Sequence, residues 1–221
     1  IVSHLEMYHN AGGMRLTAAT LGSLLKYPWT ADTPNGQNRG KFNIYRTELP
    51  FMRHIADELG LKKVDEYKYA RHPLVYLVEA ADDICYEIMD IEDAHKLKIL
   101  SFEDTRDLML GFVNPGSREH IIERSRQVDD KNENVVYFRS CAIGALEREC
   151  VRVFVENEDA ILNGTFDGSL LKHSCPLIKD AYDACVKVAT TRIYRSRDVV
   201  DTELAGYKII STLRTFLLSS D

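Results

Sequence analysis

Long apolar runs and cysteine pairs are both missing from this chain of 221 residues. No apolar stretch approaches the roughly 20 residues that a membrane-spanning helix needs, and no basic segment followed by an apolar one marks a signal peptide. The five cysteines are odd in number and contain no C-x-x-C spacing, which excludes the common zinc and redox motifs. We therefore expect no membrane partner, a cytoplasmic location, and reduced thiols that are mostly buried.

The chain has no excess of positive charge. Its formal net charge is −6 and its pI is near 5.7, so a surface that binds nucleic acid broadly is not expected. A local basic patch at a phosphate site remains open. Any polyanionic ligand must therefore be bound by a few local side chains.

A complete metal motif is absent as well. The seven histidines form neither an H-E-x-x-H motif nor a His-Asp dipeptide. The sequence by itself therefore predicts no complete metal site.

Helical periodicity runs along the whole chain, with no alternating strand pattern and no repeat of 20 to 50 residues. The hydrophobic fraction of 45% and the charged fraction of 28% are typical of a globular domain. We predict an all-α, multi-helix bundle forming a single domain over residues 1–221, with an irregular loop at 29–43 and a break at 114–116. Helices are expected at 1–9 (the end of one), 16–27, 47–59, about 20 residues from 74, 101–113, 132–157, 176–196 and 200–218.

Two adjacent carboxylates, Asp82 and Asp83, lie on a helix with a strong apolar face. Neighbouring residues point about 100° apart on a helix, so only one of them can share a face with Tyr86 at i+4. An inward carboxylate needs a cation or a hydrogen-bond partner, which a metal or a basic residue would supply. The alternative is a solvated acidic stripe along the same helix, made of Glu79, Asp83, Glu87, Asp90 and Asp93.

Basic side chains flank the long loop. Lys26 and Tyr27 precede it, and Arg39 and Lys41 lie near its end, so both clusters could bind phosphate. A lysine at a helix C-terminus is also favoured by the helix dipole alone.

Glu203 and Gly206 lie early in the last predicted helix. A glycine there costs about 1 kcal/mol relative to alanine, which close packing or the approach of a ligand would explain. Glu203 could bind a ligand or could be a first-turn acid favoured by the dipole.

Several blocks together resemble the deoxyguanosine triphosphate triphosphohydrolase family of HD-type hydrolases. The most distinctive block is E-A-A-D-D-I-C-Y at 79–86, which follows R-H-P-L at 71–74. The other blocks are G-G-M-R-L-T at 12–17, K-Y-P-W at 26–29, E-L-A-G-Y at 203–207 and, more weakly, N-G-T-F at 163–166. They occur in the family's order and extend over nearly the whole chain.

The resemblance implies hydrolysis of a dNTP, with dGTP favoured, to a deoxynucleoside and inorganic triphosphate. It implies a divalent metal (Mg, Mn, Co or a similar ion) that activates water, with Asp82 as one of the metal's ligands. The resemblance also implies which residues contact the substrate. Lys26, Tyr27 and Lys41 would bind the triphosphate, Tyr86 the nucleotide and Glu203 the nucleoside end, and Tyr194 would lie near the base.

The family's first metal-binding histidine, its His-Asp pair and its catalytic His/Glu segment have no counterpart here. In the family these precede the block at 12–17. We therefore expect the chain to be the C-terminal part of such an enzyme, to contain only part of the active site, and to be inactive alone. Ile1 at the start also favours a piece of a longer enzyme. The resemblance further implies a homo-oligomer.

Two alternatives to the hydrolase remain. One is a non-catalytic helical module that binds nucleotide or mediates oligomerisation. The other is a protein that binds single-stranded nucleic acid, as partner or effector, through Arg15, Arg39, Arg195 and Arg197.

Overall fold

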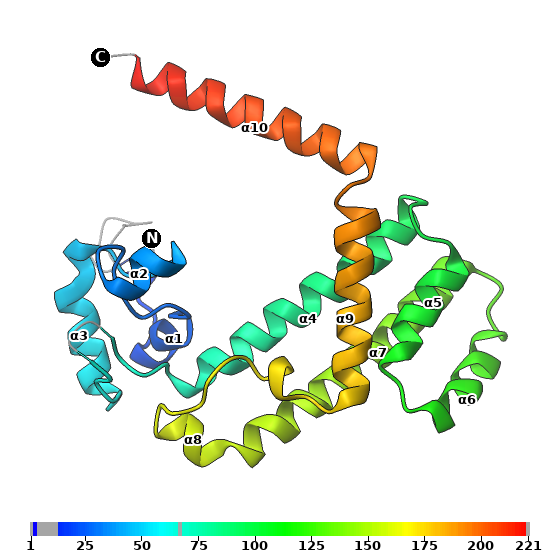
Figure 1. Cartoon of the computed structure of the whole chain (residues 1–221), viewed down its shortest axis with the longest axis horizontal. Helices are drawn as coiled ribbons and strands as arrows, with labels where there is room; N and C mark the ends of the chain where they lie inside the picture. Colours follow the sequence, from blue (N-terminus) through cyan, green and yellow to red (C-terminus); the bar gives the residue numbers. More distant parts are fainter. Residues whose placement is uncertain (1, 4–12, 66–67, 220–221) are drawn as a thin grey trace. The chain divides into compact units, whose positions relative to one another are not determined.

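The computed structural model describes residues 2–3, 13–65 and 68–219, and in these residues the fold is helical (Figure 1). The described residues contain no β-strand, only an isolated bridge between Lys63 and Tyr69, so the all-α prediction is confirmed. The described residues form the α-helices α1 (Ala18–Ser23), α2 (Pro34–Arg39), α3 (Leu49–Glu58), α4 (Pro73–Lys96), α5 (Phe102–Gly111), α6 (Pro115–Ser125), α7 (Lys131–Glu156), α8 (Glu158–Leu162), α9 (Pro176–Val188) and α10 (Arg197–Leu218). None of these described helices is both long enough and apolar enough to cross a membrane.

The chain divides into two compact units. Unit 1 comprises Ile1–Asp83 and Glu149–Ser174, and unit 2 comprises Ile84–Arg148 and Cys175–Asp221. Helices α4 and α7 each contribute residues to both units. The single domain over residues 1–221 stays a prediction.

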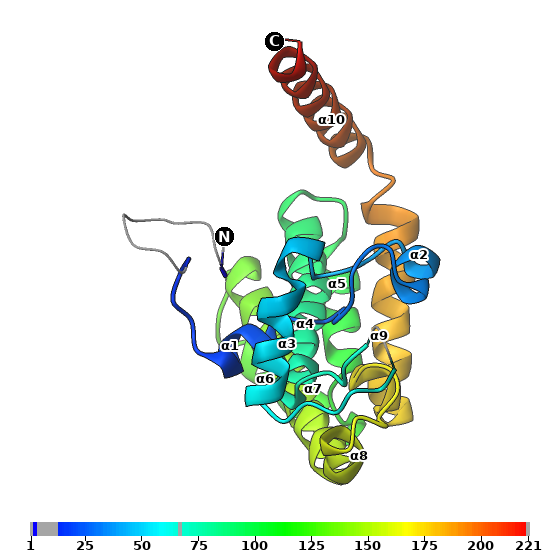
Figure 2. The same ribbon diagram turned by 90° about the vertical axis from the view of Figure 1, so that its left-hand side faces the viewer.

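In unit 1, α1 and α3 lie side by side, as Figures 1 and 2 both show. Thr17 caps α1 by accepting a hydrogen bond from the backbone N–H of Thr20 at 3.2 Å. A small core of Ile44, Met52 and Ala56 is buried beside these helices. The prediction of a helix over 16–27 was too long, because α1 ends at Ser23, and the helix end predicted at 1–9 lies outside the described residues apart from 2–3.

The segment 29–43, predicted to be an irregular loop, contains helix α2. Thr33 is its N-cap and accepts a hydrogen bond from Gly36 N–H at 3.1 Å, and Pro34 occupies the first turn. Gly40 ends the helix in the left-handed conformation, with φ of 61°. The prediction was wrong because Thr-Pro, which is typical of turns, is equally typical of a helix start.

Unit 2 is built on buried apolar side chains from α4, α5, α7 and α9; those with least exposure include Ile88, Ile91, Met109, Phe138 and Cys185. Ser101 caps α5 as predicted, accepting a hydrogen bond from Asp104 N–H at 3.0 Å. The break predicted at 114–116 is instead the start of α6. There Asn114 accepts a hydrogen bond from Gly116 N–H at 3.0 Å and caps α6, whereas α5 has already ended at Gly111.

Helix α9 continues into one π-helical turn, Ala189–Ile193, before α10 begins. The backbone N–H of Tyr194 donates to the Ala189 carbonyl at 2.9 Å, a bond to the fifth residue back that defines such a turn. No residue of α10 is buried in the described chain. Thus α10 differs from every long helix before it, each of which buries a face.

Candidate functional site

The predicted site residues fall in both units. Lys26, Tyr27, Lys41 and Asp82 belong to unit 1. Tyr86, Tyr194 and Glu203 belong to unit 2.

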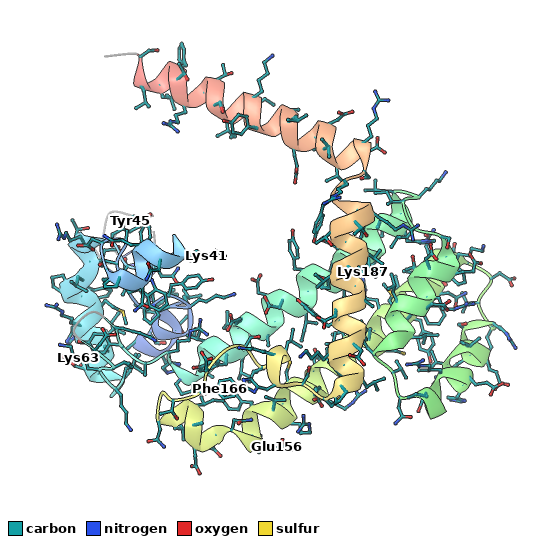
Figure 3. All side chains as sticks on the ribbon, in the orientation of Figure 1. Lys41, Tyr45, Lys63, Glu156, Phe166 and Lys187 are labelled. Atoms are coloured by element: carbon teal, nitrogen blue, oxygen red, sulfur yellow. The ribbon has the colours of Figure 1, made fainter. Side chains whose placement is uncertain are left out.

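In unit 1, hydrogen bonds between the two ends of the segment 27–44 bring Lys41 to Tyr27. Asn43 accepts from the Tyr27 backbone N–H at 2.7 Å, and the Asn43 N–H donates to the Tyr27 carbonyl at 3.1 Å. The indole N–H of Trp29, 3% exposed, donates to the Lys41 carbonyl at 2.8 Å. As a result, Lys41 Nζ lies 5.9 Å from the centroid of the Tyr27 ring (Figure 3).

Lys26 forms an ion pair with Glu79 of α4, with Nζ 3.1 Å from Oε1. The other oxygen of Glu79 lies 3.1 Å from the Arg71 guanidinium, and Arg71 Nε donates to the Lys26 carbonyl at 2.9 Å. Burial lowers the pKa of Lys26, but the hydrogen bond and charge of Glu79, together with Asp83, outweigh it and hold the pKa above its ordinary value. Lys26 is therefore a fixed cation, and its side chain is still 32% exposed.

Asp82 is exposed, and so is Tyr86, at 62%. Asp83 is the half-buried member of the pair, and burial raises its pKa, with Lys26 opposing the shift. The inward-facing pairing of Asp82 with Tyr86 considered from the sequence is thus not found in the described chain. The acidic stripe is not uniformly solvated either, because Glu79 and Glu87 are buried.

Among residues 2–3, 13–65 and 68–219, no three His, Cys, Asp or Glu side chains come close enough to hold a metal ion. Asp82 is a carboxylate without such companions, and a single carboxylate does not make a metal site. The described residues therefore do not fit a resident metal on their own. The metal and Asp82's part in binding it stay predictions.

In unit 2, the two predicted tyrosines come together. The Tyr194 hydroxyl donates to Asp90 Oδ2 at 2.6 Å, and it also interacts with the Tyr86 hydroxyl. Burial and these two partners raise the pKa of Tyr194 strongly. Because the π-helical turn at Ala189–Ile193 shifts the helix register just before Tyr194, it determines where this side chain points.

Glu203 is exposed on α10, and no partner for its carboxylate is found among the described residues. A Cβ added at Gly206 would meet no atom within 4 Å. Close packing within the described chain is thus not the reason for Gly206, and the approach of a ligand remains a prediction. The structure does not bring Glu203 to the tyrosine pair.

Sequence reasoning gave Arg71 no role and considered Glu79 and Asp90 only as members of the acidic stripe. Each is a polar partner of a predicted residue: Arg71 and Glu79 of Lys26, and Asp90 of Tyr194. A signal for the first two was available, since both lie in the blocks at 71–74 and 79–86 that carry the family resemblance.

No protein-family model matches the chain. The chain is 34% identical, over 218 residues, to a deoxyguanosinetriphosphate triphosphohydrolase-like protein of Pseudomonas aeruginosa (strain LESB58). The aligned region covers 96% of the chain and 48% of that protein. A protein of the same name from Synechocystis sp. (strain ATCC 27184 / PCC 6803 / Kazusa) is 29% identical over 231 residues, covering 100% of the chain and 50% of the relative. The deoxyguanosinetriphosphate triphosphohydrolase of Yersinia pestis (strain Pestoides F) is 31% identical over 228 residues, covering 95% and 44%.

These relatives confirm the resemblance that the sequence blocks carry. The match extends along nearly all of the chain, so it does not rest on one motif. The chain spans about half the length of the curated relatives it matches.

Proposed function

Because the chain is homologous over nearly its whole length to deoxyguanosinetriphosphate triphosphohydrolases and proteins like them, we propose that it is part of an enzyme that hydrolyses dNTPs. The reaction splits a dNTP, with dGTP favoured, into the deoxynucleoside and inorganic triphosphate. The cluster of Lys26, Tyr27 and Lys41 is the observation that carries the proposal.

Lys26 and Lys41 bind the triphosphate, where negative charge accumulates as the bond to the nucleoside breaks. Fixed cations stabilise such charge most when they need no rearrangement during the reaction. Lys26 meets this condition, because Glu79 holds its ammonium and Arg71 holds its carbonyl. The Tyr27 ring lies next to Lys41 and directly follows Lys26 in the sequence.

The nucleoside end is bound in unit 2. Tyr86 offers an exposed ring to the sugar, and Tyr194, held by Asp90, lies next to it as a neighbour of the base. Glu203 reaches this end only if α10 packs onto it, since the described chain leaves Glu203 exposed. These roles are proposals that the pairing of the two tyrosines supports.

Asp82 would be one ligand of the divalent metal that the family resemblance implies. The remaining ligands must come from outside the described residues, which lack a suitable cluster. In this proposal unit 1 contributes residues that bind phosphate, unit 2 contributes residues that bind the nucleoside, and residues outside the described chain supply the rest of what the reaction needs. We further propose that the enzyme is a homo-oligomer.

The proposal is tested with Lys26→Ala in the enzyme at its full natural length. Because this variant lacks the ammonium that stabilises the negative charge forming on the triphosphate, we expect turnover to fall by about 100-fold. Release of triphosphate from dGTP is measured, with Lys63→Ala as the control because Lys63 is exposed and distant in sequence from the cluster (Figure 3). Unchanged turnover in Lys26→Ala would remove Lys26 from the site.

The isolated chain separates the hydrolase from a nucleotide-binding regulator. As part of a catalytic site it binds dGTP weakly and releases no triphosphate. Tight binding of dGTP by the isolated chain, with no hydrolysis by the full-length protein, would favour the regulator instead.

A further inference from the structure

Unit 1 contains a pocket of about 430 Å³. Its walls come from the segment that starts at Tyr27, from Val64 and residues 68–71, from the first two turns of α4 and from residues 164–172. Its volume is in the range of pockets that bind small molecules. Of the triphosphate residues proposed above, Tyr27 lines it.

Three cations line this pocket: Lys68, Arg71 and Lys172. Arg71 is paired with Glu79, whereas neither lysine has an ion-pair partner among the described residues. The pocket's other carboxylate is Asp167. With Arg71 and Glu79 balanced, two lysines face one aspartate, so the pocket carries a net positive charge.

The cations are placed against aromatic rings. Lys68 Nζ lies 5.8 Å from the Trp29 ring centroid, and the Arg71 guanidinium carbon lies 5.6 Å from the Tyr76 centroid. A cation on a ring face keeps its charge while its alkyl stem is packed. Its charge is therefore available to an anion that enters the pocket.

Two glycines allow the walls to come this close. Gly164, with φ of +70°, lies where an added Cβ would be 2.5 Å from Ala70 Cβ. Gly168, with φ of +89°, lies beneath Lys172, and an added Cβ would be 2.9 Å from Lys172 Cδ. The segment 164–172 can therefore pack against residues 68–71, and lay Lys172 across its own loop, only because glycine occupies both positions.

The segment 164–172 is also tied to α4. The Tyr76 hydroxyl donates to the Phe166 carbonyl at 3.2 Å, and the two rings meet edge to face with centroids 5.3 Å apart (Figure 3 labels Phe166). The wall that carries Lys172 is thus fixed to the helix that carries Glu79.

We propose that this pocket binds a phosphate chain, with Lys68 and Lys172 contacting the phosphates beyond the reach of Lys26 and Lys41. Lysine is a point charge that binds phosphate oxygens without a fixed direction, which suits a flexible chain. Tyr27 links the two groups of lysines, because it lies beside Lys41 and also lines the pocket. This inference deepens the proposed function and rests on it for the identity of the ligand.

Inorganic triphosphate is the probe. Its binding to the full-length protein is measured by calorimetry in metal-free buffer with a chelator, so that hydrolysis and metal chelation play no part. Lys68→Gln and Lys172→Gln each weaken binding by about tenfold, the effect of one charge-assisted hydrogen bond. The matched control is Lys63→Gln, because Lys63 is an exposed lysine five positions before Lys68 in the sequence and does not line the pocket.

Thermal unfolding of each variant shows whether it folds, and Lys172→Arg, which keeps the charge, should restore most of the affinity. If Lys68→Gln, Lys172→Gln and Lys63→Gln bound triphosphate with equal affinity, the proposal that the pocket binds phosphate would be wrong, even if dGTP were still hydrolysed. Lysine-dependent triphosphate binding without any dGTP hydrolysis would uphold the pocket and reject the proposed function.

Inhibition kinetics identify the source of the phosphate chain. Competition between triphosphate and dGTP means that the chain belongs to the substrate or to its leaving group. Non-competitive inhibition that Lys172→Gln weakens means that the pocket binds a separate polyphosphate. Either pattern supports the pocket, and inhibition that no pocket variant alters contradicts it.

Discussion

Two buried glutamates on α4, eight residues apart in sequence, have opposite surroundings. Glu79, in unit 1, meets the Lys26 ammonium and the Arg71 guanidinium, one on each oxygen. Glu87, in unit 2, is 5% exposed, and its Oε1 has no hydrogen-bond partner in the part of the chain that the structure describes. Burial, with Asp90 adding to it, raises the pKa of Glu87 to about 7.

The comparison shows that burial alone does not determine the state of a carboxylate. Glu92, farther along the same helix, is 2% exposed, yet the hydrogen bonds and charges of Lys96 and Arg139 outweigh its burial and lower its pKa. Cations on Glu79 and Glu92 compensate the cost of desolvation. Glu87 has no such cation among the described residues, and it binds a proton more readily instead.

The largest effect is expected when Glu79 loses a partner. Arg71→Met keeps the alkyl stem but leaves a buried carboxylate with one cation and removes the bond to the Lys26 carbonyl. The free energy of unfolding falls by about 3 kcal/mol. Urea denaturation followed by the fluorescence of Trp29, the chain's one tryptophan and a residue of unit 1, measures it.

Arg53→Met serves as the control, because Arg53 is exposed on α3. If Arg71→Met and Arg53→Met lowered the free energy of unfolding equally, the ion pair between Arg71 and Glu79 would contribute no more to stability than an exposed arginine does.

A smaller and pH-dependent effect is expected at Glu87. Its pKa is raised from 4.5 to about 7 by folding, so below pH 4.5 it is protonated in both states and costs nothing. Between these values the unfolded state releases the proton that the folded state keeps, so stability falls as pH rises. Glu87→Gln removes this loss and raises the free energy of unfolding at pH 8 by up to about 3 kcal/mol, with little change at pH 4.

Urea denaturation at several pH values measures the difference in the free energy of unfolding between Glu87→Gln and the unchanged protein. The titratable groups near Glu87 are Asp90 and Cys185. Glu119→Gln, at an exposed position on α6, is the control. A gain for Glu87→Gln that is the same at pH 4 and pH 8 would show that ionisation is not its cause.

The smallest effect is expected at Lys96, which lies 2.9 Å from Glu92 but has a side chain 53% exposed. Solvent screens an ion pair with one exposed member, and Arg139 remains on the other oxygen. Lys96→Met lowers the free energy of unfolding by far less than Arg71→Met does. A loss as large as that of Arg71→Met in the same denaturation assay would show that exposure does not set the value of these pairs.

The sequence predicted the long helices well because each has a long apolar face. Helix α7 at Lys131–Glu156 differs from the predicted 132–157 by a single residue at each end. Short helices were missed where the same residues serve two purposes: Thr33 and Pro34, or Asn114 and Pro115, suit a turn as well as a helix start.

The candidate site was predictable only in part. The family blocks indicated Lys26, Tyr27 and Lys41, and hydrogen bonds between residues 27–29 and 41–44 bring the last two together. Glu79 was considered part of a solvated stripe, because its partners lie in other segments and helical spacing does not reveal them. The π-helical turn before Tyr194 likewise has no sequence signal that we used.

Because no described residue of α10 is buried, the helix should open quickly. Its amides are protected only by the hydrogen bonds of the helix itself, and a helix of 22 residues without tertiary packing opens on the microsecond scale. Hydrogen exchange in α10 should therefore be fast, while amides of α7, which has a buried face, exchange on the scale of global unfolding. Glu203 thus samples many positions until something packs against its helix, and slowed exchange at 203–207 would report that event.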